Sequence, residues 1–226
     1  MKYIVIGLGY FGTSLATKLT SIGHEVIGVD NRSERAEELK DRITNMMIMD
    51  STNQKALESL PISDVDGIIV AIGEDIGSSI LTLSMLKKLH VKRLIGRAIN
   101  PRHQSILSEL GIEEIVHPEE DTATIVSSLL MIKDAVSILP LNDEFIIAEI
   151  IIPVKYIGHT LDTINLESRF DVKPIAVKIA PKEQGRDKIL RKDFKVDKTC
   201  DRNRPLREND RLLIIGDTFK IKQIID

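Results

Sequence analysis

Three glycines in the segment Gly7-Leu8-Gly9-Tyr10-Phe11-Gly12 follow directly on the apolar run Ile4-Val5-Ile6. Glycines at this spacing permit a tight turn, let the backbone approach a pyrophosphate, and allow the following helix to pack closely. The N-terminus of that helix favours an anion, because its first amide groups are unpaired and point toward the ligand. We therefore expect this segment to form a phosphate-binding turn.

An acidic residue, Asp30, ends the next apolar run, about 20 residues beyond the glycines. A carboxylate at this place accepts hydrogen bonds from ribose hydroxyls and repels a 2′-phosphate. The pattern therefore favours NAD or adenosine phosphates over NADP, with Asn31 and Arg32 as neighbouring contacts. The positive charge of Arg32 leaves NADP as an open alternative.

Further polar residues follow the later apolar runs, where the carboxyl ends of parallel strands meet at one edge of a sheet. Asp50 could contact the ligand or cap a helix, Gly73 could be an ordinary turn glycine, and Arg97 could bind phosphate or form a surface ion pair. Glu119 could hold a divalent cation that bridges phosphates. The expected contacts at these strand ends are Asp50, Ser51, Thr52, Ala71, Ile72, Gly73, Glu74 and Arg97.

Short β-branched runs alternate with helical spacing from the start to about residue 118, which is typical of parallel βαβ units. This alternation predicts an α/β fold, a Rossmann-type doubly wound parallel sheet, as a domain spanning 1–118. Asn100-Pro101 and Gly111 have the preferences of a helix start and end. The six expected strands are Tyr3 to Ile6, Glu25 to Val29, Met46 to Met49, Gly67 to Ile72, Arg93 to Gly96 and Glu114 to Val116.

The segment from Asp121 to Leu139 reads as one long helix between Pro118 and Pro140, with apolar residues on more than one stripe. We expect a crossover or dimerisation helix over 119–139, or else a terminal helix packed on its own sheet. Residues 140–226 then form a small α+β domain. Its expected elements are strands at Phe145 to Val154, Pro174 to Ile179 and Arg211 to Ile215, and a helix from Thr218 to Ile225.

The composition is that of an ordinary globular protein, with 42% hydrophobic and 29% charged residues and a formal net charge of −3. This charge gives no case for nucleic acid as a partner. No run reaches the length of a membrane helix and the first residues hold no signal peptide, so we expect a cytoplasmic protein without direct membrane insertion.

Cys200 is the only cysteine, which excludes an intrachain disulfide. Lys182 to Arg207 holds ten Lys or Arg against five Asp or Glu and is interpreted mainly as a solvated loop.

The order of these motifs resembles the regulator-of-potassium-conductance family of the Trk and Ktr uptake systems. The resemblance runs from Gly7 through Asp30, Asp50-Ser51-Thr52 and Ala71-Ile72-Gly73 to His117-Pro118-Glu119. Gly158-His159-Thr160-Leu161, Pro174 to Val177 and Glu208 to Leu212 resemble its companion C-terminal domain. It implies a cytosolic homodimer that assembles into a ring and regulates a membrane potassium-translocating subunit at the inner face of the membrane, according to bound NAD(H) or ATP/ADP. Some members bind cyclic di-AMP in the C-terminal domain, and here Pro174 to Ile179 with Arg202 and Arg204 could supply contacts.

One residue departs from this family, because Ktr-like members often carry Arg where this chain has Tyr10. The departure leaves the preference between a triphosphate, a diphosphate and NAD open. The rival hypothesis is a small NAD-dependent oxidoreductase, since the same glycine pattern serves dehydrogenases. About 85 C-terminal residues offer little for a substrate pocket and no evident acid or base, so we expect a regulatory protein rather than an enzyme.

Overall fold

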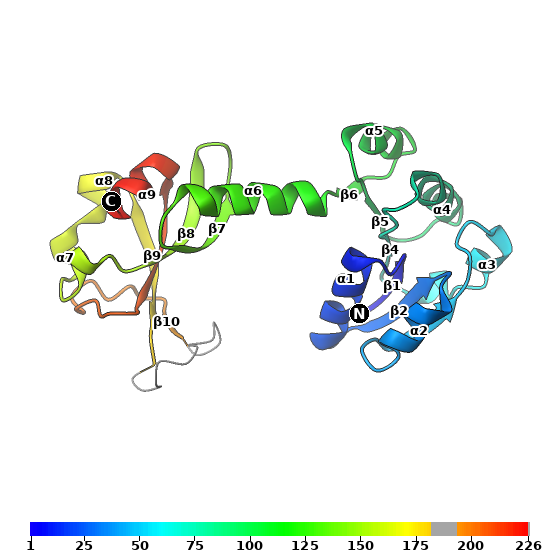
Figure 1. Cartoon of the computed structure of the whole chain (residues 1–226), viewed down its shortest axis with the longest axis horizontal. Helices are drawn as coiled ribbons and strands as arrows, with labels where there is room; N and C mark the ends of the chain where they lie inside the picture. Colours follow the sequence, from blue (N-terminus) through cyan, green and yellow to red (C-terminus); the bar gives the residue numbers. More distant parts are fainter. Residues whose placement is uncertain (182–193, 226) are drawn as a thin grey trace. The chain divides into compact units, whose positions relative to one another are not determined.

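The computed structural model describes residues 1–181 and 194–225 of the 226-residue chain. The chain divides into two compact units, one from Met1 to Glu120 and one that begins at Asp121 (Figure 1). Each unit has its own sheet and its own hydrophobic core. Residues 182–193, which make up much of the basic segment noted above, lie outside the described residues.

The first unit is built on a parallel sheet of six strands in the order β3-β2-β1-β4-β5-β6. The chain moves outward from β1 to β3 and then returns to the other side of β1, which creates a topological switch point between β1 and β4. The expected doubly wound sheet is therefore confirmed. Its strands are β1 (Lys2–Ile6), β2 (Glu25–Asp30), β3 (Asn45–Ile48), β4 (Gly67–Val70), β5 (Leu94–Arg97) and β6 (Glu114–Val116).

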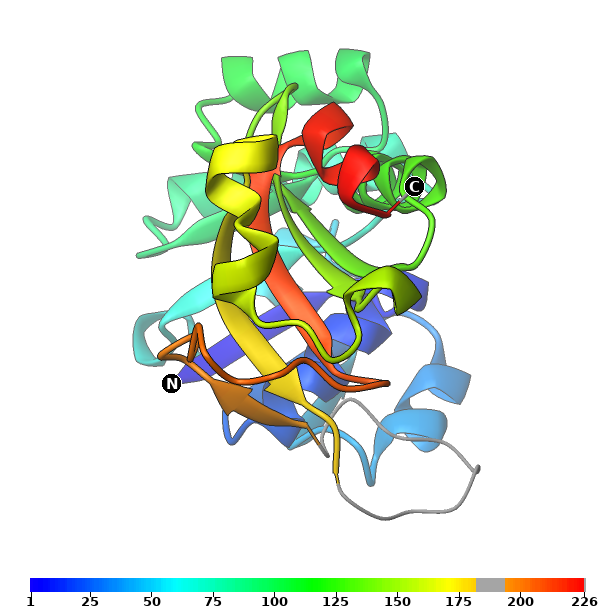
Figure 2. The same ribbon diagram turned by 90° about the vertical axis from the view of Figure 1, so that its left-hand side faces the viewer.

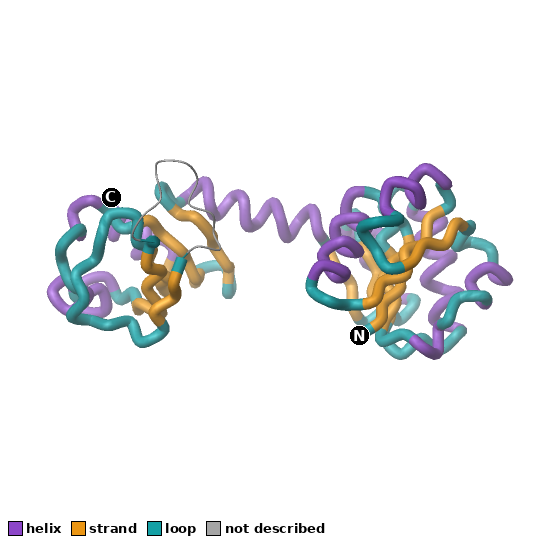
Figure 3. Tube along the Cα trace, turned by 90° about the horizontal axis from the view of Figure 1, so that it is seen from below, coloured by secondary structure: helices purple, strands orange, loops and turns teal. Residues whose placement is uncertain are grey.

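Helices cover both faces of this sheet, as Figure 3 shows for the first unit. Successive residues of β1 point to opposite faces, so Val5 packs in one core with Ala16, whereas Ile4 and Ile6 pack in another with Leu83. A strand buried on both faces requires the continuous apolar run seen in the sequence. The helical elements are α1 (Tyr10–Ser21), α2 (Ser33–Leu39), α3 (Gln54–Glu58), η1 (Ile62–Asp64), α4 (Ile76–Lys88) and α5 (Pro101–Glu109).

The second unit contains an antiparallel sheet in the order β10-β9-β11-β8-β7. Helices α8 and α9 pack beside β9 and β11 (Figure 2), where Leu166, Ile221 and Ile224 contribute to its core. This arrangement confirms a small α+β module. Its elements are β7 (Ala135–Pro140), β8 (Phe145–Ile151), η2 (Val154–Tyr156), α7 (Leu161–Ile164), α8 (Leu166–Phe170), β9 (Lys173–Ile179), β10 (Lys195–Asp197), β11 (Arg211–Asp217) and α9 (Thr218–Ile225).

The helix expected from Asp121 to Leu139 is wrong in its second half. Helix α6 covers Pro118–Met131, and the chain then turns through Asp134, whose φ is 62°. Residues Ala135–Pro140 form β7, which pairs with β8 and places Ile138 opposite Ala148. The β-branched residues in this stretch favour a strand, and pairing with β8 decides against continuing the helix.

His103, on α5, is a buried polar residue outside the sheet edge. Its side chain is 1% exposed, and neither ring nitrogen has a hydrogen-bond partner among the described residues. Burial disfavours the charged imidazolium and lowers the pKa of His103 below its ordinary value of 6.5. The folded state therefore favours the neutral ring over the charged imidazolium.

We expect this histidine to make the fold sensitive to acid. As the pH falls below about 6.5, the unfolded chain takes up a proton that the folded chain refuses, so the free energy of unfolding falls by up to about 1.4 kcal/mol per pH unit until the folded pKa is reached. In the variant His103→Met, the free energy of unfolding should lose this part of its dependence on pH. Urea unfolding between pH 7.5 and 5 measures it, and equal slopes in both proteins would contradict the assignment.

Candidate nucleotide-binding site

The glycine segment forms the turn between β1 and α1. Gly7 has a φ of 88°, which residues with a side chain rarely adopt, and its amide donates to the Val29 carbonyl at 2.8 Å. A Cβ on Gly12 would lie 2.0 Å from the Gly7 carbonyl oxygen, whereas one on Gly9 would meet nothing within 4 Å. Gly12 thus permits close packing of the helix, and Gly9 leaves open space at the start of α1.

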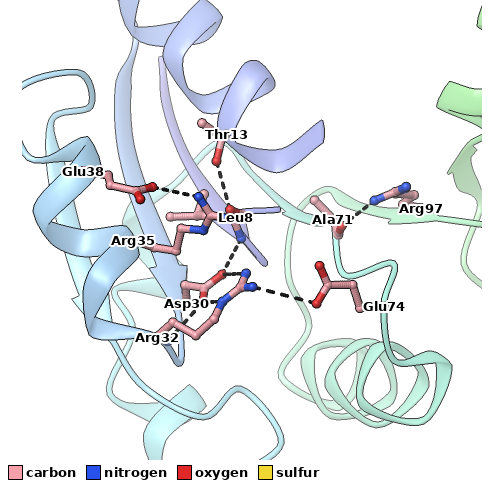
Figure 4. Close-up of polar contacts among 9 residues, drawn as sticks. All are labelled: Leu8, Thr13, Asp30, Arg32, Arg35, Glu38, Ala71, Glu74 and Arg97. Carbon is pink, nitrogen blue, oxygen red and sulfur yellow. Dashed lines mark hydrogen bonds and ion pairs between the residues drawn. The ribbon is translucent and has the colours of Figure 1, made fainter. Parts of the chain in front are cut away.

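Asp30, at the end of β2, is tied directly to this turn. The Leu8 amide donates to the Asp30 carboxylate at 2.7 Å, and both residues are buried (Figure 4). This hydrogen bond joins the carboxyl ends of two adjacent strands, so the position of the acid relative to the turn is held by the backbone. The glycine turn and the acidic residue predicted to act with it are therefore in direct contact.

Arg32 occupies the remaining side of the same carboxylate. Its backbone amide and Nε donate to Asp30 Oδ1 at 3.1 and 2.8 Å, and its Nη2 donates to Oδ2 at 3.1 Å. Burial alone would raise the pKa of Asp30, but the hydrogen bonds from Arg32 and Leu8 together lower it below its ordinary value. Asp30 is therefore an ionised acceptor at neutral pH.

These groups open onto a cavity of about 600 Å³ at the carboxyl edge of the sheet. Of the residues predicted from the sequence, Leu8 and Gly12 are buried behind its wall, and the others line it. The prediction missed Ile6, Val29 and Met49, which are strand or strand-end residues, and Asp75 and Ser78 at the start of α4. The full lining is Ile6, Gly7, Gly9, Tyr10, Phe11, Val29, Asp30, Asn31, Arg32, Met49, Asp50, Ser51, Thr52, Ala71, Ile72, Gly73, Glu74, Asp75, Ser78, Arg97 and Glu119.

Asp50 and Asp75 each support a local turn in the wall. Asp50 accepts from the Thr52 amide at 2.8 Å and from its hydroxyl at 2.7 Å, and Asp75 caps α4 by accepting from the Ser78 amide at 3.2 Å. These contacts fix the shape of each loop, and α3 is capped by Asn53, so the prediction that Asp50 caps a helix is wrong. Asp75 was recognisable from the sequence as an N-cap candidate three residues before Ser78.

Arg97, at the end of β5, lines the cavity and is held by three contacts. Its Nη1 donates to the Ala71 carbonyl at 3.2 Å, its Nη2 pairs with Glu119, and its guanidinium lies 5.5 Å from the centre of the Phe11 ring. A Cβ on Gly73 would lie 2.5 Å from Nη1, so the absent side chain makes room for the arginine. Arg97 is thus held in place and only 14% exposed.

Carboxylates outnumber guanidinium groups in the cavity, and each guanidinium group is paired with a carboxylate. Its described lining holds carboxylates at Asp30, Asp50, Glu74, Asp75 and Glu119 and guanidinium groups at Arg32 and Arg97. The helix N-terminus at Gly9, which no side chain caps, adds unpaired amide donors. This set fits a ligand with a phosphate group at one end and hydroxyl donors at the other. Among the described residues no cluster of three or more His, Cys, Asp or Glu has the arrangement of a metal site.

The fold and this site define a doubly wound domain with a dinucleotide-type phosphate turn. Residues 3–118 match the family named TrkA-N domain. Ktr system potassium uptake protein C of Bacillus subtilis (strain 168) is 33% identical over 177 residues, which cover 78% of this chain and 80% of the relative. Ktr system potassium uptake protein A of the same strain is 31% identical over 177 residues, with the same shares of 78% and 80%. The chain belongs to the TrkA-N family.

Solved structures share the fold at lower identity. The GsuK RCK domain superimposes with a TM-score of 0.63 and 18% identity, covering 99% of this chain and 47% of that one. The GsuK channel bound to NAD superimposes with a TM-score of 0.62 and 16% identity, covering 100% of this chain and 39% of that one. This chain therefore spans less than half the length of either structure.

Gly12 and Gly9 allow a test of the two glycine roles. Gly12→Ala should lower the free energy of unfolding by about 2 to 3 kcal/mol, because its methyl group collides with the Gly7 carbonyl and neither backbone can yield freely. Gly9→Ala should change it by less than about 1 kcal/mol, since its methyl group enters open space and its φ of −68° suits alanine, which offsets the preference for glycine over alanine at a helix start. Chemical denaturation measures both. Equal losses in the two variants would show that the turn is packed differently.

Proposed function

We propose that this chain is a regulatory subunit that binds NAD(H) or ATP/ADP in the cavity of its first unit and so controls a membrane potassium-translocating protein. The observation that carries the proposal is the Leu8–Asp30 hydrogen bond, which brings a phosphate-binding turn and a ribose acceptor into one cavity. Relatives named as potassium uptake proteins supply the biological context. The solved GsuK channel bound to NAD, which shares the fold, supports a dinucleotide as ligand.

The alternative of a small NAD-dependent oxidoreductase finds less support in the wall of the cavity. A dehydrogenase needs a positioned proton donor or acceptor beside the nicotinamide. The described lining includes no histidine, lysine or cysteine. Its five carboxylates all have partners within the chain, because Asp50 and Asp75 accept hydrogen bonds in their own turns and the other three lie beside Arg32 or Arg97. Its one phenol, Tyr10, is 95% exposed, and no hydrogen bond orients it. The residues that line the cavity are suited to binding and positioning a nucleotide, and this favours a regulatory role over a catalytic one.

A route from ligand to regulation begins at Arg97. Its partner Glu119 lies in the first turn of α6, the helix that leads out of the first unit. A ligand phosphate that binds Arg97 competes with Glu119 for the same guanidinium. A ligand regulates only through a difference in its affinity for two states, and this exchange supplies such a difference. Released Glu119 is also the carboxylate that could hold a divalent cation beside the phosphates, as predicted from the sequence.

The proposed assembly is a homodimer that forms a ring beneath its membrane partner. Helix α6 contains no buried residue, and it exposes Ile125, Val126, Leu130 and Met131 by 39 to 83%. Apolar surface of this kind is stabilised by association. Among the described residues no helix combines the length and apolar character required to cross a membrane. The relatives named as potassium uptake proteins support a cytoplasmic protein that reaches the inner face of the membrane through its partner.

Cyclic di-AMP remains a further proposal for the second unit. The strand predicted from Pro174 to Ile179 is present as β9. Arg202 is paired with Glu167 at 3.0 Å and Arg204 with the buried Asp210 at 2.7 Å. Both guanidinium groups would therefore have to leave a carboxylate to bind phosphate, which makes this proposal weaker than nucleotide binding in the first unit.

Asp30→Ala tests the proposed function. Removing the ribose acceptor should weaken binding of NAD and ADP by about 1.5 to 3 kcal/mol, the usual contribution of a hydrogen bond to a charged group. Isothermal titration calorimetry measures the change, with Asp64→Ala, an exposed aspartate outside the cavity, as the matched control. Binding that is unaltered by the Asp30 change would show that the cavity has another ligand.

The variant Leu130→Glu tests the proposed homodimer. A charge on this 83% exposed leucine should dissociate a dimer that buries it, because an unpaired carboxylate is costly in an apolar interface. Light scattering at micromolar concentration reports the mass, and Ser128→Glu adds the same charge on another side of α6. A wild-type protein that is already monomeric would remove the ring from the proposal and leave nucleotide binding intact.

A further inference from the structure

The hydrogen-bond capacity of Asp30 is fully used within the chain itself. A carboxylate offers about four acceptor positions, and the amides of Leu8 and Arg32 together with Nε and Nη2 of Arg32 fill them at 2.7 to 3.1 Å. Two of these donors are backbone groups and stay in place with the turn. The other two belong to one mobile side chain, which is 39% exposed at its pair with Asp30.

We propose that the Arg32 side chain is an internal competitor for the ribose site and a determinant of its ligand specificity, which rests on the proposed nucleotide function. The two N–H groups of its guanidinium end occupy the acceptor positions that two neighbouring ribose hydroxyls need. A ribose can bind Asp30 only when Arg32 leaves. The apparent affinity is then the intrinsic affinity multiplied by the fraction of chains in which Arg32 has left Asp30.

The guanidinium has a second position available when it leaves. Its Nη1 lies 3.8 Å from the Glu74 carboxylate, which follows β4 and is 86% exposed (Figure 4). Arg32 can therefore exchange a buried partner for an exposed one and remain paired. Because both carboxylates line the same cavity, the arginine moves along its rim rather than out into solvent.

This arrangement also bears on the choice between a 2′-hydroxyl and a 2′-phosphate. Arg32 is the cation that a 2′-phosphate would need, but its charge is already neutralised by Asp30. A 2′-phosphate that displaced Arg32 would face an ionised Asp30, which repels it. A ribose with free hydroxyls donates to the same carboxylate instead. The pair thus selects for NAD and ADP and against NADP.

The decisive variant is Arg32→Met, which keeps most of the side-chain length and removes the donors and the charge. Calorimetric titration with ADP, NAD and NADP should show that ADP and NAD bind about twofold to fivefold more tightly than to the wild type, the range expected when a partly exposed ion pair no longer competes. NADP should gain nothing. Arg32→Lys keeps the charge but cannot form the two-pronged pair, so its gain should be intermediate.

Arg35→Met is the matched control, because Arg35 lies three residues further along, in α2, and pairs with Glu38 at 2.7 Å outside the cavity. It should leave all three affinities unchanged. Weaker binding of ADP and NAD to Arg32→Met would overturn the proposal by showing that Arg32 is a ligand contact. Unchanged affinity, or a loss confined to NADP, would overturn it as well. Failure of the wild type and the variant to bind any of the three would instead contradict the proposed function, and this inference with it.

Discussion

The close contact between Gly12 and the Gly7 carbonyl is the constraint on which the site in the first unit depends. A Cβ at Gly12 would lie 2.0 Å from that oxygen, so only glycine lets α1 start this near to the end of β1. This approach turns the Leu8 amide toward Asp30 at 2.7 Å and leaves the start of α1 open at Gly9. The proposed phosphate end and the proposed ribose end of the cavity are therefore positioned by one turn.

Both guanidinium groups of the cavity have a carboxylate partner within the chain. Arg32 is bound to Asp30, and Arg97 is bound to Glu119 and the Ala71 carbonyl. Nucleotide binding at such a site is an exchange of partners rather than the filling of empty positions. The helix N-terminus at Gly9 is different, because its amides are free of a side-chain cap. We infer that the phosphate end supplies net binding free energy, whereas the ribose and the distal phosphate contacts set selectivity and response.

The sequence predicted those parts of the structure that depend on local chemistry. The glycine turn, Asp30 and all six strands of the parallel sheet follow from glycine spacing and from short apolar runs, which in the central strands β1, β2 and β4 are mostly buried. The strand Ala135–Pro140 was assigned to a helix, because its short apolar run fits either structure until β8 is seen beside it. The missed wall residues Val29 and Met49 carry no polar group, so nothing in their type marked them.

The carboxylate partners of the two arginines could not be identified from the sequence, and they change the role of these residues. Arg97 was predicted either to bind phosphate or to form a surface ion pair, and Arg32 was predicted to contact the ligand, yet each has a carboxylate partner in the folded chain. Affinity is then a difference between similar interactions, and it is smaller than the sum of the ligand contacts suggests. A site of moderate affinity changes its occupancy when the ligand concentration changes around its Kd. Pairing within the chain therefore suits a protein that reports nucleotide levels better than one that holds a permanent cofactor.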